Sequence, residues 1–180
     1  GFNITAPKSD AFEIIDGGDL TIDNKSTTES TVYAGVESGE GVGSLCAVWA
    51  HGGKATINNG TFRVSQDKDG KRNDCIYAGS NSDSKSGEII INGGKFEFDW
   101  GGNEKNLTNA YNGDQFLLNC ADNVNTAKIT VNGGSFKNHV PGKESVGDGE
   151  VSLGEGMKVY KGNTEVTTAH SGDDAWYNVK

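Results

Sequence analysis

Arginine and proline are scarce in this chain, and long apolar runs are missing. Only Arg63 and Arg72 are arginines, and acidic residues outnumber basic ones by 25 to 16, which gives a formal net charge of −9. A nucleic-acid-binding surface needs the opposite balance, so we expect no nucleic-acid partner. No apolar run approaches the length of a membrane-spanning helix, so we expect no membrane insertion. With 27 glycines but only 2 prolines, the composition favours many tight turns over a disordered linker.

Cysteine is also rare, with three residues and no CxxC motif. An odd number cannot pair completely, so we expect reduced thiols that act as small apolar fillers rather than as metal or redox groups. The strand patterns described below predict that Cys46 and Cys120 face inward, whereas Cys75 occupies an outward or edge position. Nothing in the composition or the motifs indicates a cofactor, and we expect none.

The strongest signal is an internal repeat of an apolar strand, an Asn-Gly corner and a phenylalanine. Three copies align without gaps, and a fourth, degenerate copy starts at Leu20; the aligned segments are 55–62, 89–96 and 129–136. The last apolar residue of the first strand recurs every 34 to 40 residues, at Ile22, Ile57, Ile91 and Val131. Alternation of period 2 indicates strands, and the glycines supply the positive φ of a sharp corner.

A further strand precedes each copy, which makes three strands and three corners per repeat. This arrangement predicts an all-β fold: a right-handed parallel β-helix, or solenoid, of about four coils with a C-terminal β cap. We assign residues 1–150 to the β-helix and residues 151–180 to capping strands of the same domain. An antiparallel sandwich does not explain why one corner chemistry recurs, and no six-residue period indicates a left-handed solenoid.

Stacked coils bring equivalent residues to within one strand spacing, so the repeat predicts three rows of side chains. An asparagine ladder would join Asn58, Asn92 and Asn132, and a core stack would join Phe62, Phe96 and Phe136. An outward charge row would follow the phenylalanines by one residue, at Arg63, Glu97 and Lys137.

Several aromatic residues are candidates for a glycan-binding face or an interface. Trp49 and Tyr77 align at outward positions of neighbouring coils, with Asn119 continuing their row; they would stabilise the sheet or contact a partner. Tyr33, Trp100 and Tyr111 fall in long insertions that we expect on one side of the solenoid. Such rings would stack on sugars or pack beneath their own loops.

Metal binding and catalysis find little support. Asp67 and Asp69, followed by Asp74, resemble part of a calcium loop, but the downstream bidentate glutamate is missing, so we expect a solvated acidic loop. The three histidines, His51, His139 and His170, lie in different contexts, with no nucleophile motif nearby. No stacked pair of carboxylates emerges of the kind that polysaccharide-cleaving enzymes need. We therefore expect no catalytic residues and no enzymatic activity.

Four sets of residues together carry a family resemblance: the segments 47–53, 76–78 and 154–159 and the three Asn-Gly-Phe repeats. They resemble β-helical virion proteins of tailed bacteriophages that infect gut Bacteroidetes, especially head-fibre and tail-associated proteins. Related repeats occur in secreted surface proteins of the host bacteria. The resemblance implies a non-enzymatic structural or attachment module, often a homotrimer, on the virion surface. Its partners would be other virion proteins or its own subunits.

The leading functional hypothesis is thus a virion appendage or capsid-decorating β-helix that attaches to host-surface or mucosal glycans. The first alternative is a secreted adhesin or glycan-binding protein on the bacterial surface. The second is a polysaccharide lyase or hydrolase. A depolymerisation screen separates the enzyme from the other two, and the neighbouring genes separate phage from bacterial origin.

Overall fold

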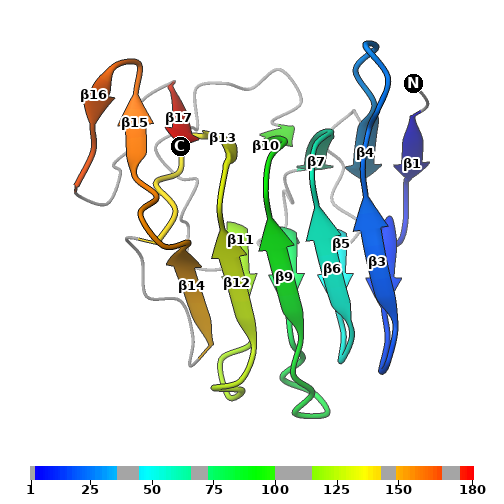
Figure 1. Cartoon of the computed structure of the whole chain (residues 1–180). Coiled ribbons are helices and arrows are strands. Elements are labelled where there is room, and N and C mark those ends of the chain that lie inside the picture. The colour runs from blue at the N-terminus through cyan, green and yellow to red at the C-terminus, as the bar shows by residue number, and fades with distance from the viewer. Residues whose placement is uncertain (1–2, 36–44, 66–72, 100–114, 143–148, 168–174) are drawn as a thin grey trace.

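The computed structural model describes residues 3–35, 45–65, 73–99, 115–142, 149–167 and 175–180. All regular structure in these segments is β-strand, arranged in three sheets (Figure 1). The all-β class predicted from the sequence is therefore confirmed. In the same segments no helix is long and apolar enough to cross a membrane.

Each sheet combines strands that are far apart in the sequence. The first sheet has the order β1 (Ile4–Ala6), β4 (Thr31–Ala34), β7 (Thr61–Ser65), β10 (Lys95–Asp99), β13 (Gly134–Lys137), β17 (Trp176–Val179), β15 (Val159–Lys161) and β16 (Thr164–Glu165). The second has the order β11 (Gln115–Cys120), β8 (Asn73–Ala78), β5 (Cys46–Ala50) and β2 (Phe12–Ile14). The third has the order β14 (Glu150–Leu153), β12 (Lys128–Val131), β9 (Glu88–Ile91), β6 (Lys54–Ile57) and β3 (Asp19–Ile22).

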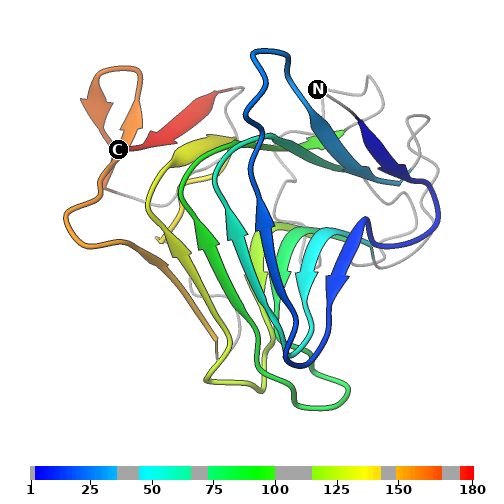
Figure 2. The ribbon, with the colours of Figure 1, turned by 45° about the vertical axis from the view of Figure 1, so that its right-hand side comes forward.

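Consecutive strands belong to successive sheets. Each strand from β4 to β13 pairs in parallel with the strand three places before it in the chain. Figure 2 shows the three sheets around one interior, and the core cluster draws residues from all three. The chain thus returns to each sheet after one sequence repeat, which explains why one motif recurs at 34 to 40 residues.

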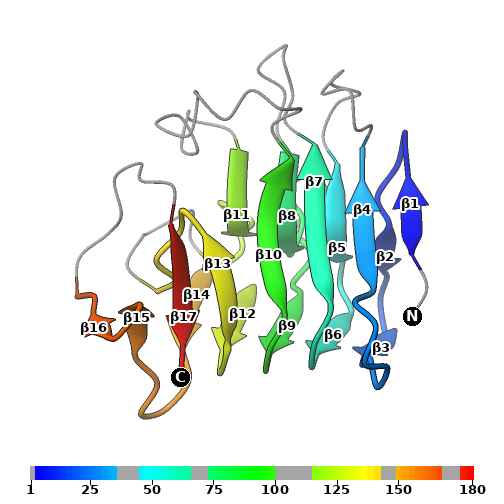
Figure 3. The same ribbon diagram turned by 90° about the horizontal axis from the view of Figure 1, so that it is seen from above.

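The C-terminal segment departs from this parallel order only after β14. That strand still pairs in parallel with β12. The last strands are antiparallel: β17 pairs with β13 on one side and with β15 on the other, and β15 pairs with β16. Figure 3 shows them side by side at the C-terminal end of the first sheet. They cover an edge that would otherwise expose unpaired backbone groups.

The interior is built from residues at equivalent positions. Alternation in the third sheet sends every second side chain inward, and these are fully buried: Ala55, Ile57, Ile89, Ile91, Ile129 and Val131. The predicted phenylalanine stack is confirmed. Phe96 lies between Phe62 and Phe136, with ring-centroid distances of 5.1 and 4.9 Å and nearly parallel rings. All three rings have no exposed surface.

The predicted asparagine ladder at the corners is also confirmed. The side-chain amide of Asn92 donates to the side-chain oxygen of Asn58 at 2.9 Å, and Asn132 donates to Asn92 at the same distance. The glycine that ends each corner has φ between 111° and 119°, in the left-handed region that side chains other than glycine rarely adopt; these residues are Gly60, Gly94 and Gly134. The recurring Asn and Gly residues at the corners are therefore explained by two requirements, the side-chain hydrogen bonds of asparagine and the backbone conformation of glycine.

The outward charge row after the phenylalanines is confirmed in part. Arg63 and Glu97 are strand partners, and the Arg63 Nε lies 3.0 Å from a Glu97 carboxylate oxygen. Tyr33 precedes Arg63 in the same row, and the guanidinium lies 5.8 Å from its ring centroid. Lys137, expected next to Glu97, pairs across the sheet with Trp176, and its ammonium lies 5.6 Å from that indole.

A longer charge row at the start of the third sheet was not predicted. Neighbouring strands pair residues of alternating sign along the whole sheet, in the order Asp19, Lys54, Glu88, Lys128 and Glu150. Glu88 at its centre lies 3.5 Å from the Lys54 ammonium and 3.1 Å from that of Lys128. The signal was present in the alignment, because each residue directly precedes the aligned apolar strand.

Three strands of the second sheet break the regular alternation. In each, two consecutive residues are at most 2% exposed and both belong to the core: Ala47–Val48, Cys75–Ile76 and Leu117–Leu118. A regular strand would send one of each pair outward. The ladder between β5 and β8 skips this point, passing from the pair Cys46–Asp74 to the pair Val48–Ile76.

This irregularity corrects two predictions about the cysteines. All three are free and buried. Cys46 does not belong to the core cluster and lines a surface groove with Trp49 and Tyr77, so its predicted inward position is wrong. Cys75, however, has no exposed surface and belongs to the core, so its predicted outward or edge position is wrong. Burial raises the pKa of the Cys75 thiol far above its ordinary value, and burial raises that of Cys120 to about 12. Low thiolate content and poor access make both thiols unreactive.

Candidate functional site

The outer face of the second sheet carries the predicted aromatic pair. Trp49 and Tyr77 are strand partners, and Asn119 is the next partner along the row, as the alignment predicted. The ring centroids of Trp49 and Tyr77 are 6.3 Å apart, with planes tilted by 36°. The Trp49 indole N–H donates to the backbone oxygen of Gly79 at 2.8 Å, which fixes the ring orientation. Both rings remain partly exposed.

The other aromatic candidates do not join this pair. Tyr33 is not in a loop but in β4, where it is 5% exposed and contacts the Arg63 guanidinium. The prediction that it lies in a long insertion is wrong, because the first repeat is degenerate and its third strand does not show the repeat's signature. Trp100 and Tyr111 lie outside the described residues.

Trp49 and Tyr77 form part of a surface groove of about 230 Å³. Asp10, Cys46 and Asp74 also line it, as do the turn residues Ser80, Asn81 and Ser82. A hydrogen bond from the Ser80 N–H to the Lys85 oxygen, 2.9 Å long, closes this turn, and Ser84 adopts a positive φ of 56° within it. The groove therefore combines two aromatic rings with carboxylates and hydroxyl groups.

Both groove carboxylates are held by hydrogen bonds. Asp10 accepts a bond of 2.6 Å from the Cys46 backbone N–H. Burial raises the pKa of Asp10, with a further contribution from Glu13, and these effects outweigh the Cys46 bond, which lowers it. Asp74 is 4% exposed and accepts a bond of 3.1 Å from the buried side-chain amide of Asn119. Burial and fixed geometry make these carboxylates stronger partners for a ligand than free surface groups.

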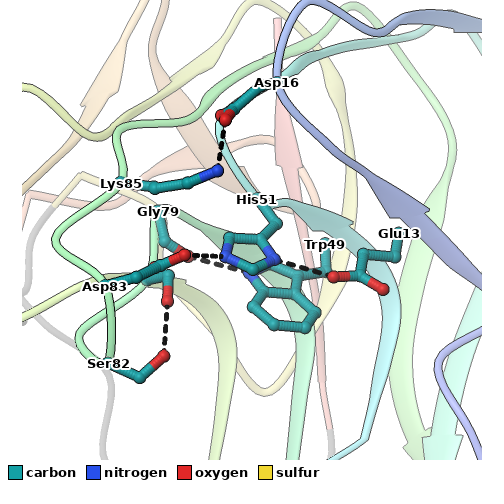
Figure 4. Close-up of polar contacts among 9 residues, drawn as sticks. Glu13, Asp16, Trp49, His51, Gly79, Ser82, Asp83 and Lys85 are labelled. Atoms are coloured by element: carbon teal, nitrogen blue, oxygen red, sulfur yellow. Dashed lines mark hydrogen bonds and ion pairs between the residues drawn. The ribbon is translucent and has the colours of Figure 1, made fainter.

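A charged cluster adjoins the groove at the end of β5 (Figure 4). The imidazole of His51 lies between two carboxylates, with Nδ1 2.7 Å from Glu13 and Nε2 2.9 Å from Asp83. It stacks on the Trp49 indole at a centroid distance of 4.3 Å and an interplanar angle of 4°. Partial burial lowers the pKa of His51, but the hydrogen bonds to Glu13 and Asp83 outweigh it, so the pKa lies above its ordinary value.

Neighbouring bonds hold the cluster in place. Hydrogen bonding to the Ser80 side chain is the main reason that the pKa of Asp83 lies below its ordinary value, and His51 and Lys85 lower it further. Lys85 pairs with Asp16, chiefly through a hydrogen bond that raises the pKa of Lys85. The cluster therefore links β2, β5 and the 80–85 turn through ion pairs.

The geometry of this cluster suits charge stabilisation better than nucleophilic catalysis. Both ring nitrogens of His51 are engaged by carboxylates, so neither can accept a proton from a serine hydroxyl. Ser80 and Ser82 instead contact each other, with their oxygens 3.0 Å apart. The repeat does not predict this cluster, because the residues of the turn that carries Asp83 do not recur in the corresponding turns of the other repeats.

The calcium candidates are not brought together in the described structure. Asp67 and Asp69 lie outside the described residues, and Asp74 belongs to strand β8, not to a loop. In the described segments, no group of three or more His, Cys, Asp and Glu side chains could hold a metal ion. His139 lies near Phe136 instead, with ring centroids 6.2 Å apart, and His170 is outside the described residues.

A scan of protein-family models, a search of curated proteins and a search of solved structures each found no match to this chain. Its function must therefore be argued from its own surfaces.

Proposed function

We propose that this chain is a right-handed parallel β-helix of about four coils with a C-terminal β cap, and that it acts as a non-enzymatic attachment module. In this proposal it is an appendage or capsid-decorating protein of a tailed phage virion, and it binds a host-surface or mucosal glycan in the Trp49–Tyr77 groove. The groove is the observation on which the binding role depends.

The β-helix is supported by the strand order. Parallel pairing of each strand with the third strand before it is the connectivity that a three-sided coil produces. Rows of stacked asparagines and phenylalanines, one from each repeat, also fit coils that lie directly above one another. Such a rod suits an exposed appendage, because its stability comes from contacts between neighbouring coils.

Glycan binding is supported by the chemistry of the groove. Sugar rings have an apolar face that packs on aromatic side chains, and hydroxyl groups that bond to carboxylates and hydroxyls. Trp49 and Tyr77 supply partly exposed rings, while Asp10, Asp74 and the serine turn supply the polar groups. His51 stacks on one face of the Trp49 indole, and Tyr77 lies beside Trp49 in the groove.

Attachment to another virion protein is supported by the N-terminal strands, where β1, β2 and β3 each form the edge of a sheet. A second pocket of about 540 Å³ opens there onto apolar side chains: Ile4, Phe12, Leu20, Ile22 and Val32. A partner would bring a strand edge and apolar groups to this end. It would also bring basic groups, because residues 3–25 contain five carboxylates against two lysines.

Two other roles compete with this proposal. A secreted bacterial adhesin would use the same groove, so only the genomic neighbourhood or the location of the protein separates it from a virion module. A polysaccharide lyase or hydrolase would need a base free to take a proton, and the engagement of His51 by Glu13 and Asp83 argues against that residue. We therefore favour binding over catalysis.

Glycan-array binding with a matched pair of variants tests the proposal. The whole chain should bind a subset of glycans, and Tyr77→Ala should abolish that binding. Tyr160→Ala removes a partly exposed tyrosine from β15, far along the chain from the groove, and should leave binding unchanged. Equal binding by Tyr77→Ala and the parent would show that the groove is not the site. Release of oligosaccharides from a panel of polysaccharides would instead favour an enzyme. Labelling of virions with an antibody specific for this protein tests whether it lies on the virion surface.

A further inference from the structure

The His51 imidazole connects strand β2 to the turn at residues 80–85. Its Nδ1 lies 2.7 Å from Glu13 of β2, and its Nε2 lies 2.9 Å from Asp83 of the turn (Figure 4). An ionised carboxylate can only accept a hydrogen bond, so each contact needs a hydrogen on the ring nitrogen. A neutral imidazole carries one such hydrogen, whereas an imidazolium carries two. Both contacts therefore form together only when His51 is protonated.

From this geometry we propose that His51 is a pH-operated latch: its protonated ring ties the 80–85 turn to β2, and loss of the proton releases one of the two contacts. In the neutral ring, one nitrogen has a lone pair in place of its hydrogen, and this lone pair would face a carboxylate oxygen. Two acceptors without a hydrogen between them repel, so the neutral ring keeps either Glu13 or Asp83 but not both. When Asp83 is released, the turn is held only by contacts that do not involve His51.

The surroundings of His51 favour the latched form. The ring stacks on the Trp49 indole at a centroid distance of 4.3 Å, and an aromatic face attracts a cation. Partial burial opposes the charge, but the bonds to the two carboxylates outweigh it and raise the pKa of His51, so the latch opens at a pH above about 6.5. Because the side chains of Glu13 and Asp83 are 42% and 39% exposed, solvent screens the attraction and the effect should be modest.

The neighbouring charged groups do not act as the switch. Lys85 at the end of the turn pairs with Asp16, which follows β2, and this bond is the main reason that the pKa of Lys85 lies above its ordinary value. The pKa of Asp83 lies below its ordinary value, chiefly because of a hydrogen bond with the Ser80 side chain. Both shifts lead away from neutral pH. The titration of His51 is therefore what changes the charge of the cluster between about pH 6 and about pH 8.

The latched turn forms one wall of the Trp49–Tyr77 groove. Three of its residues line the groove: Ser80, Asn81 and Ser82. Loss of the Asp83 anchor frees the middle of the turn, and with it this wall. A wall that is fixed before binding costs less to order when a ligand arrives, so the latched form should bind a ligand more tightly. This consequence for the groove, unlike the latch itself, rests on the proposed glycan-binding function.

Amide hydrogen exchange of the free protein, followed by NMR, tests the latch. The Ser80 N–H closes the turn by donating to the Lys85 oxygen at 2.9 Å, so its protection factor reports how firmly the turn is held. After correction for the intrinsic effect of pH on exchange, this factor should fall roughly two- to fivefold between about pH 6 and about pH 8, which is what the loss of an exposed ion pair allows. Its midpoint should coincide with the titration of the His51 ring. The Val166 N–H, which donates to Val159 at 2.8 Å in the β15–β16 hairpin, should keep its protection factor.

Asp83→Asn removes the switch and keeps the contact. An asparagine amide both donates and accepts, so it can bond to the neutral ring as well as to the protonated ring. The protection factor of Ser80 should then be the same at both pH values. His51→Gln, which has no charge to lose, should also show no pH dependence. Glu165→Gln is the control, because it removes a carboxylate that pairs with Lys158 in the C-terminal segment; it should keep the pH dependence of the parent chain.

The outcomes separate the latch from the proposed function. A protection factor of Ser80 that is equal at both pH values in the parent chain would overturn the latch, and so would the same fall in Asp83→Asn or at Val166. For a glycan that the parent chain binds, affinity should fall by a similar factor over the same pH range. An affinity that does not depend on pH would overturn the effect of the latch on the groove. Failure to bind any glycan would contradict the proposed function alone, because the exchange measurement needs no ligand.

Discussion

Truncation of Phe96 to alanine tests how the core is held together. The ring is fully buried and has a neighbouring ring on each face, at 5.1 Å from Phe62 and 4.9 Å from Phe136. Phe62 has a neighbouring ring on one face only, that of Phe96, and its other side lines the pocket near β1, β2 and β3. The two positions therefore form a matched pair within one stack.

The magnitudes follow from this difference. Removal of a buried phenylalanine side chain costs about 3–5 kcal/mol, and the cost rises with the volume of the cavity that remains. At Phe96 the flanking rings are held in place by their own strands, so the cavity cannot collapse and the cost should lie near 5 kcal/mol. Each aromatic pair adds about 0.5–1.5 kcal/mol, and Phe96 loses two pairs where Phe62 loses one. Phe62→Ala should therefore cost about 0.5–1.5 kcal/mol less.

Urea denaturation followed by tryptophan fluorescence measures both variants under the same conditions. Phe96→Leu is a milder control that keeps part of the volume and should lose less than either alanine variant. A cost below about 1 kcal/mol for Phe96→Ala would mean that the ring is not in the core. A larger cost at Phe62 than at Phe96 would refute the argument that the stack is tighter at its centre.

Three further outcomes are expected. Glu88→Lys would place three cations in a row with Lys54 and Lys128, and each lost ion pair is worth roughly 0.2–1 kcal/mol. High salt should recover most of the fall in melting temperature. A loss that does not depend on salt would contradict the charge row. Maleimide should label Cys75 and Cys120 only as slowly as the protein unfolds, and rapid labelling of either would contradict its burial. The pKa of His51 measured by NMR should lie above its ordinary value of about 6.5 and should fall in Glu13→Gln. A pKa that is higher in the folded than in the unfolded protein stabilises the fold at pH values below the unfolded pKa. This contribution to stability should disappear as pH rises through the folded pKa.

The predictable parts of the fold are those that repeat. Asn92 and Phe96 stand at the same offset in three copies, so their stacking followed from the alignment alone, without knowledge of the loops between copies. The pairing of Trp49 with Tyr77 followed in the same way. The end of the repeat also indicates capping strands within residues 151–180, although it does not predict the antiparallel pairing of β17 with β13.

The failures occurred where the repeat is imperfect. Cys75 was placed outward by strict alternation, but the second sheet turns two consecutive side chains inward at this point, which a period-2 pattern cannot express. Tyr33 was taken for a loop residue because its strand lacks the Asn-Gly-Phe signature. The contact between His51 and Asp83 depends on the path of a single turn, for which the chain contains no second copy to compare.

The same contrast locates function within the fold. In the third sheet, the inward rows are apolar from strand to strand and the first row has charges that alternate in sign, and such rows stabilise the register. The outer row of the second sheet reads Glu13, Trp49, Tyr77 and Asn119, with no type repeated. A row of unlike residues adds little to register, yet it brings a carboxylate and two partly exposed rings together on the outer face, next to the buried amide of Asn119. Binding sites need such diversity of side chains on a fixed scaffold. The proposed binding groove therefore lies on a row where the repeated strands supply rigidity but the side chains differ from strand to strand.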